Sequence, residues 1–242
     1  MDIVISEEQG VRNLHFGSPW IQGAMRIARP YALELEYTRE MMASLLFTGM
    51  DAPPRRALMV GLGVGALPKF VWKHCPACTI DVVEIEPAVH AAAIQHFKWP
   101  RNDPRLQVHL GCGAEFMAQS QETYDLVLID GFDHRARVGP LNTVEFYSDC
   151  AKRLGPQGYL AVNLLSNQKD FKPGQARLNA AFEGRSVFLP PCDSGNLIAL
   201  AHNGAGFEVD AAELNARVDQ IKATTGLNLK SVSTKLKATL GL

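Results

Sequence analysis

Two aspartates follow an apolar run near the middle of the chain. Asp130 ends the segment YDLVLID, and Asp133 lies three residues later in GFDHRARVGP. A carboxylate at the end of a buried strand can take a proton from an attacking amine as a general base. It can also hold a cationic amine through a charge-assisted hydrogen bond. Asp130 and Asp133 are therefore the candidate catalytic pair, and the alternative is that either residue only caps the following loop.

A glycine-rich loop, VGLGVGALP, lies earlier in the chain, between an apolar run and a segment with helical spacing. Gly61, Gly63 and Gly65 allow a sharp turn and a close approach of the backbone to a ligand. An acid about 20 residues further on would accept hydrogen bonds from ribose hydroxyls, and both Glu84 and Glu86 qualify. The pattern predicts a nucleoside-containing cofactor without separating NAD from S-adenosyl compounds. A tight turn with no ligand is the alternative.

Alternating strands and helices must position these residues. The apolar runs that predict strands are 56–63, 79–86, 106–111, 124–130, 158–165, 186–190 and 196–203. Helical periodicity is found at 66–74, 87–97, 142–155, 175–184 and from 210 onward. The last two strands are separated only by PCDSG, which is too short for a parallel crossover. We therefore expect them to pair antiparallel.

Seven strands with helices between them predict a doubly wound α/β sheet. The strand count and the antiparallel ending are typical of the Rossmann-like fold of class I S-adenosylmethionine-dependent methyltransferases. Ligands of such sheets bind in the crevice outside the carboxyl ends of the strands. Asp130 and the glycine loop are expected to meet in that crevice.

The first 50 residues predict a small extension. Residues 11–27 hold two short extended runs around a Gly-Ser-Pro turn, which is typical of a β-hairpin. Residues 29–47 have the spacing of a helix, and GMDAPPRR at 49–56 has the composition of a linker. We expect an N-terminal hairpin and linking helix in 1–50 and a Rossmann-like catalytic domain in 55–242.

The composition argues against several classes of protein. A formal net charge of -1 on 242 residues does not favour a nucleic-acid or membrane-surface binder. The acidic N-terminus does not predict a signal peptide, and no apolar run has the length of a membrane span, so we expect a cytoplasmic protein. The five cysteines are odd in number and scattered. Cys75 and Cys78 form one CPAC, which we interpret as a solvent-side loop; a redox pair or half a zinc site is the alternative.

The order of several motifs is similar to that of the spermidine synthase (polyamine aminopropyltransferase) family. The resemblance covers about residues 57 to 165 and includes VEIE, NDPRLQVHLGCGAEF, YDLVLIDGFD and EFYSDCAKRLGPQGYL. SPWIQGAMRI and REMMASLL more weakly resemble the family's N-terminal strand pair and linking helix. About 56 residues precede the first predicted strand of the sheet, so the resemblance implies a shortened N-terminal domain.

The resemblance also implies roles for single residues. Glu84 would bind the ribose of decarboxylated S-adenosylmethionine, and Asp130 would take the proton from the acceptor amine. Asp133 would help to hold that amine, and Gln22 would lie near it. The reaction would move an aminopropyl group from a sulfonium to a small-molecule amine and release methylthioadenosine, without a metal. The family commonly forms dimers, so a homodimer is expected.

Three departures from the family pattern bear on the substrates. Val64 occupies the place of an aspartate that contacts the amino end of the donor in the family. Cys112, beside Gly113 in the expected cofactor site, stands where the family has an aspartate that holds the adenine amino group. The insertion HRARV brings positive charge close to Asp133. The alternatives are therefore a methyltransferase that uses S-adenosylmethionine itself, or a non-catalytic nucleoside-binding relative; a dehydrogenase comes last.

Overall fold

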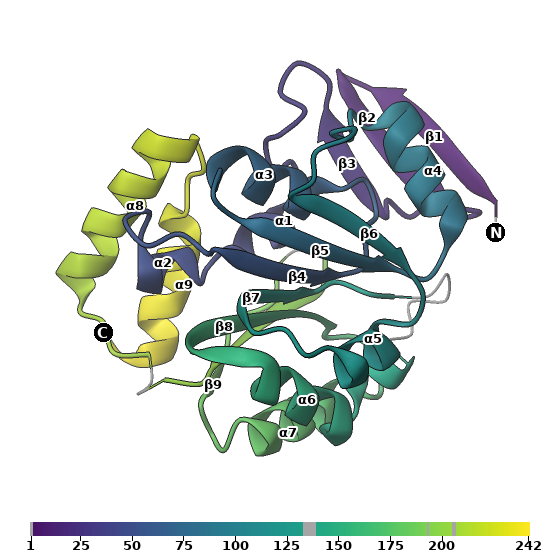
Figure 1. Cartoon of the computed structure of the whole chain (residues 1–242). Helices are drawn as coiled ribbons and strands as arrows, with labels where there is room; N and C mark the ends of the chain where they lie inside the picture. The colour runs from purple at the N-terminus through teal and green to yellow at the C-terminus, as the bar shows by residue number, and fades with distance from the viewer. Residues whose placement is uncertain (1, 133–138, 193, 205–206) are drawn as a thin grey trace.

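A seven-stranded sheet forms the centre of the computed structural model, which describes residues 2–132, 139–192, 194–204 and 207–242 (Figure 1). Its strands are β4 (Arg56–Val60), β5 (Thr79–Glu84), β6 (Leu106–Leu110), β7 (Tyr124–Ile129), β8 (Leu154–Leu165), β9 (Ser186–Phe188) and β10 (Asn196–His202). The strand order is β6-β5-β4-β7-β8-β10-β9. Neighbours among the first five strands pair parallel, whereas β10 pairs antiparallel with both β8 and β9. The predicted fold class and the antiparallel final pair are confirmed.

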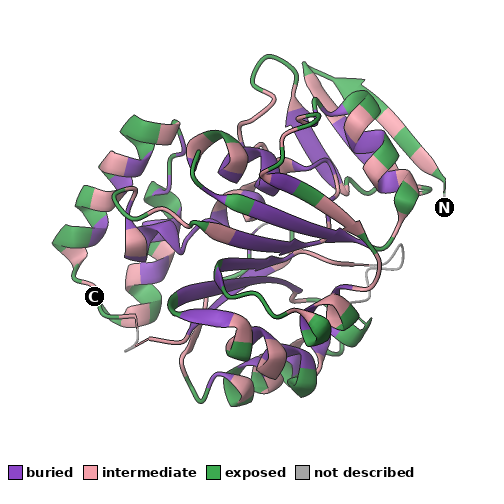
Figure 2. Ribbon diagram, viewed as in Figure 1, coloured by how far each residue is buried: buried purple, intermediate pink, exposed green. Residues whose placement is uncertain are grey.

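Helices cover both faces of this sheet. α3 (Ala66–His74) and α4 (Pro87–His96) lie on one face, and α5 (Gly113–Gln119), α6 (Val144–Arg153) and α7 (Phe171–Ala181) lie on the other (Figure 1). The central strands are buried from both sides (Figure 2), and a hydrophobic core lies on each face of the sheet. α8 (Ala211–Thr225) and α9 (Lys230–Leu240) pack beside the sheet and extend the first of these cores.

The N-terminal residues form a second, smaller sheet. β1 (Ile3–Glu8), β2 (Val11–Phe16) and β3 (Gly23–Arg26) pair antiparallel in that order. The predicted hairpin corresponds to β2 and β3, and β1 is an additional strand. Leu14 and Met25 of this sheet pack against Val64 of the glycine loop and against Phe97, which joins the two sheets through a small apolar cluster.

The expected single helix over 29–47 is wrong. The segment forms two short helices, α1 (Glu36–Glu40) and α2 (Leu45–Thr48), joined by turns over 41–44. The backbone N–H groups of residues 42, 43, 45 and 46 bond three residues back instead of four. The consecutive residues 41–44 are all buried. Four successive side chains point around the whole circumference of a helical turn, so this segment is enclosed by the rest of the fold on all sides.

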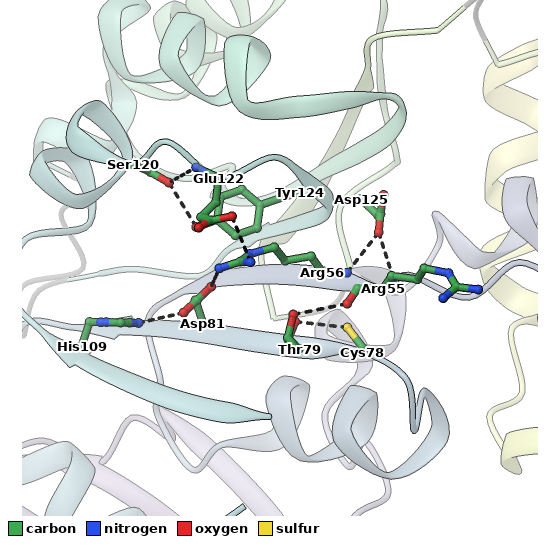
Figure 3. A network of polar contacts seen from close by, with 10 residues as sticks. All are labelled: Arg55, Arg56, Cys78, Thr79, Asp81, His109, Ser120, Glu122, Tyr124 and Asp125. Atoms are coloured by element: carbon green, nitrogen blue, oxygen red, sulfur yellow. Dashed lines mark hydrogen bonds and ion pairs between the residues drawn. The ribbon is translucent and has the colours of Figure 1, made fainter. Parts of the chain in front are cut away.

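A polar network crosslinks the strands on the face that carries α5 (Figure 3). The Arg56 guanidinium lies 2.9 Å from Glu122 and 3.4 Å from Asp81, and His109 lies 2.8 Å from Asp81. Asp125 accepts hydrogen bonds from the backbone N–H groups of Arg55 and Arg56. The network joins β4, β5, β6 and the start of β7 and holds the parallel strands in register.

The CPAC segment lies between α3 and β5, as expected, but its cysteines do not face solvent. Cys75 and Cys78 are 1% and 0% exposed. Burial raises the pKa of their thiols to about 11 and about 12. Among the described residues there is no group of three or more side chains placed to ligate a metal. None of the helices within these ranges is long and apolar enough to cross a membrane.

Candidate active site

Asp130 comes directly after β7, and its backbone N–H bonds the Val60 carbonyl at the end of β4. Asn163 Nδ2 donates a hydrogen bond to its Oδ1 at 2.8 Å, and the Tyr37 hydroxyl donates to its Oδ2 at 3.2 Å. Burial raises the pKa of the Asp130 carboxyl from 3.8 to about 6, while these two hydrogen bonds lower it. A carboxylate with this pKa is ionised at neutral pH and remains basic enough to accept a proton.

The glycine loop lies against this carboxylate. Gly61, Gly63 and Gly65 have φ angles of 93°, 51° and 69°, in the region that favours glycine. A Cβ atom on Gly61 would lie 2.3 Å from the Asp130 carbonyl oxygen. Only a glycine at position 61 therefore allows the loop to pass so close to the end of β7.

A hollow lies beside Asp130, and segments from three parts of the chain line it. Gln22 lies directly before β3 of the N-terminal sheet, Tyr37 comes from α1, and residues 61–64 come from the glycine loop. The other lining residues are Gly23, Ala24, Leu35, Thr38, Ala66, Leu67 and Pro68. Asp130 is the one charged side chain among the described residues of this lining. The fold thus brings together Gln22, the glycine loop and Asp130.

Glu84 meets the glycine loop from the opposite side, at the end of β5. It is 8% exposed, and it does not line the hollow at Asp130. Its Oε2 accepts from the Leu62 N–H at 2.9 Å, and its Oε1 accepts from the Glu86 N–H at 2.8 Å. Burial raises the pKa of Glu84, and these backbone donors oppose that shift. The Glu86 side chain instead caps α4 through the N–H of Ala88.

Two exposed apolar side chains lie near Glu84, and the sequence analysis did not identify them. Ile85 is 72% exposed and Leu110 is 55% exposed, and the register of β5 and β6 pairs Leu110 with Glu84. A planar base could pack on this apolar edge. Cys112 is the partly exposed N-cap residue of α5. Gly113 is buried, and a Cβ there would lie 2.3 Å from a Val60 methyl group, so close packing of α5 requires this glycine.

Val64 points away from solvent and into the N-terminal sheet. It is 2% exposed, and a Cβ on Gly23 would lie 2.7 Å from its Cγ1. The position is therefore occupied by an apolar contact between the glycine loop and β3. The remaining site predictions, Asp133 and the inserted His134, Arg135 and Arg137, lie outside the described residues.

Tyr37 and Asn163, the two partners of Asp130, were missed by the sequence analysis. Asn163 interrupts the apolar run LAVNLL of β8 and is 3% exposed, so a buried polar residue in a strand was the available signal. Its Oδ1 has no partner among the described residues. Tyr37 lies in the segment expected to be a regular helix, and nothing in its spacing distinguishes it from a core residue.

The chain is similar to known proteins both in sequence and in fold. The spermine/spermidine synthase domain is matched over residues 34–175. The polyamine aminopropyltransferase of Chromobacterium violaceum is 32% identical over 98% of this chain and 90% of the relative. A spermidine synthase in complex with the transition state analogue AdoDATO superposes with a TM-score of 0.65 over 99% of this chain and 88% of that chain, at 20% identity. Human methyltransferase-like protein 13 in complex with SAH gives a TM-score of 0.69 over 80% and 93%, at 24% identity.

Proposed function

Because the chain belongs to the spermine/spermidine synthase family, we propose that it transfers an aminopropyl group from decarboxylated S-adenosylmethionine to a small-molecule amine. The observation that carries the proposal is Asp130, a carboxylate with a pKa of about 6 that two neutral donors hold beside the glycine loop. A homodimer in the cytoplasm is part of the same proposal.

Asp130 acts as the general base in this reaction. The nitrogen of the acceptor amine forms a bond to the carbon next to the sulfonium sulfur, and the carbon–sulfur bond breaks. The electron pair stays on sulfur, which leaves as neutral methylthioadenosine, and Asp130 takes the proton that the nitrogen loses. Tyr37 and Asn163 fix the carboxylate through its two oxygens.

The donor nucleoside lies along the glycine loop. We assign Gly61, Gly63 and Gly65 to the close approach of the backbone to the nucleoside. We assign Glu84 to the ribose, because its carboxylate oxygens can accept hydrogen bonds from hydroxyls in addition to those from the two backbone N–H groups. The apolar edge of Ile85 and Leu110 supports the base, with the main chain at Cys112 and Gly113 beside it. Gln22 and Asp133 are assigned to the acceptor amine. AdoDATO and SAH, the ligands of the two matched structures, both contain adenosine and suit such a site.

Methyl transfer from S-adenosylmethionine is the second candidate. It is favoured by Val64, which leaves Asp130 as the one charged side chain that lines the hollow among the described residues. The ammonium of the aminopropyl donor lacks the neighbouring carboxylate that S-adenosylmethionine carries, and burying this uncompensated charge near few anions is unfavourable.

Product analysis separates the two candidates. The purified chain is incubated with 1,4-diaminobutane and either decarboxylated S-adenosylmethionine or S-adenosylmethionine, and the products are identified by mass spectrometry. We expect an aminopropylated amine and methylthioadenosine with the first donor only. Asp130→Asn should abolish this turnover and leave methylthioadenosine binding, measured by calorimetry, within about threefold. A methylated product, or near-normal turnover of Asp130→Asn, would contradict the proposal.

A further inference from the structure

The two C-terminal helices hold the segment that carries Tyr37. From α8, Arg217 donates hydrogen bonds to the carbonyl oxygens of Leu46 and Phe47. Gln220 of the same helix accepts from the backbone N–H of Met50 at 3.1 Å and donates to Asp51 at 2.8 Å. In Figure 1, α8 and α9 stand beside α2. The C-terminal helix α8 therefore anchors residues 46–51.

α9 adds an ion pair directly to α1. Lys235 Nζ lies 2.5 Å from Glu40 Oε1 and 3.5 Å from Glu36 Oε1. Glu40 is 1% exposed, and its second oxygen has no partner among the described residues. Burial raises the pKa of Glu40, and the ammonium of Lys235 opposes that shift. A buried carboxylate with one cationic partner depends on that partner for its position.

Tyr37 lies between these two acids in the sequence, on a helix of five residues. A helix this short does not hold itself in water, and α1 has no side-chain hydrogen bond at its N-cap. Its orientation must come from contacts with the rest of the fold. Lys235 forms ion pairs with Glu36 and Glu40 of α1. The Tyr37 hydroxyl of the same helix donates a hydrogen bond to Asp130 Oδ2 at 3.2 Å.

We propose that Lys235 is a positioning residue that holds the Tyr37 hydroxyl on the carboxylate of Asp130 through its ion pairs with α1. The inference rests on the proposed function for its kinetic readout. Two other described side chains affect the pKa values of Tyr37 and Asp130: Asn163 of β8 donates a hydrogen bond to Asp130, and Cys192 interacts electrostatically with Tyr37. Lys235 does not touch Asp130, so its effect must pass through Tyr37.

A double-mutant cycle tests the proposal. Lys235→Gln should lower kcat by about three- to tenfold, with little change in the KM of the donor, as expected when one hydrogen bond of ordinary net strength is lost. The acid limb of the pH profile should move to higher pH, because the Tyr37 hydrogen bond favours ionised Asp130. Tyr37→Phe should give the same two changes, and the double variant should be no slower than Tyr37→Phe alone.

Two further variants serve as controls. Lys235→Arg keeps a cation that reaches both acids and should restore most of the activity. Lys237→Gln removes a lysine of the same helix whose side chain, within the described part of the chain, bonds the exposed Asn215 at 2.7 Å, and it should leave kcat and the pH profile unchanged. If Lys235→Gln does not fold, Glu36→Gln removes the longer of the two ion pairs and should give a smaller shift in the same direction.

Additive losses in the cycle, or a lower melting temperature with an unchanged kcat and pH profile, would overturn the proposal. A readout without turnover separates this failure from that of the proposed reaction. The carboxyl carbon of Asp130 can be titrated by NMR in each variant, and its apparent pKa should rise in Lys235→Gln and in Tyr37→Phe alike. An unchanged titration in Lys235→Gln would overturn the proposal even if no donor reacts.

Discussion

Replacing Asp130 by asparagine should stabilise the folded chain while it removes the proposed base. The amide has nearly the shape of the carboxyl group and no charge. Its oxygen can accept from Asn163, and its N–H can donate to the hydroxyl oxygen of Tyr37, so both hydrogen bonds survive the change. What the substitution removes is the unfavourable burial of a charge, because burial is the main cause of the raised pKa.

The size of the effect follows from the pKa of Asp130, which is 3.8 ordinarily and about 6 in the fold. Below about pH 4 the group is protonated in both the folded and the unfolded state, so its ionisation does not contribute to the free energy of unfolding. Between about pH 4 and 6 the folded state holds a proton that the unfolded state releases, so stability falls as the pH rises. Above pH 6 the full difference applies, and 6 minus 3.8 is 2.2 units, or about 3 kcal/mol. Asp130 is partly exposed, so this value is an upper limit.

Urea unfolding of the wild type and of Asp130→Asn at pH 8 and pH 4 measures the difference. We expect the variant to be more stable by about 1–3 kcal/mol at pH 8 and nearly equal to the wild type at pH 4, where the difference should be below about 0.6 kcal/mol. The control Asp219→Asn replaces an exposed acid of α8 and should leave the free energy of unfolding nearly unchanged at both pH values. A variant less stable at pH 8, or a difference that is independent of pH, would refute the reasoning about the buried charge.

Three other substitutions give definite outcomes. Glu84→Gln should weaken methylthioadenosine binding about 10- to 100-fold in calorimetry, because hydrogen bonds to a carboxylate are lost; unchanged affinity would remove Glu84 from the site. Gly61→Ala should lose far more stability than Gly10→Ala, since both glycines have positive φ but only Gly61 has an atom within 2.3 Å of a built Cβ. Burial lowers the pKa of Lys69 from 10.5 to about 7. The unfolded state therefore binds more protons between pH 7 and 10.5, and wild-type stability should rise with pH across that window by up to about 5 kcal/mol. Urea midpoints of Lys69→Met should lack this rise.

The seven-stranded sheet was predictable because its inner strands are buried on both faces, and its strands appear as short apolar runs between helical segments. The errors lie where burial does not follow a simple period. α5 buries only Gly113 and Met117, so its apolar pattern is weak. β1 has no fully buried residue, and the turns over 41–44 bury four residues in succession. In each case the packing of distant segments, and not local periodicity, decides the structure.

The candidate site was predictable where a motif is contiguous in the sequence. The glycine loop and Asp130 each lie at the end of a strand, and parallel strands bring their carboxyl ends together. Tyr37 and Asn163 could not be found in this way, because they are 93 and 33 residues from Asp130 and only the fold makes them its partners. The packing of Val64 on Gly23 is likewise a consequence of how the N-terminal sheet docks on the loop.

Three ionisable groups affected by burial, Asp130, Glu40 and Lys69, show why Asp130 suits the role of a base. Glu40 has the ammonium of Lys235 as its counter-ion, and Lys69 donates to the Phe97 carbonyl at 2.6 Å. Asp130 has only neutral donors, Tyr37 and Asn163, among the described residues that shift its pKa. A cation within about 4–6 Å would lower the pKa of a carboxylate by about 1–3 units and weaken it as a base. Neutral donors hold the carboxylate in place and leave its pKa close to the pH at which it must exchange a proton.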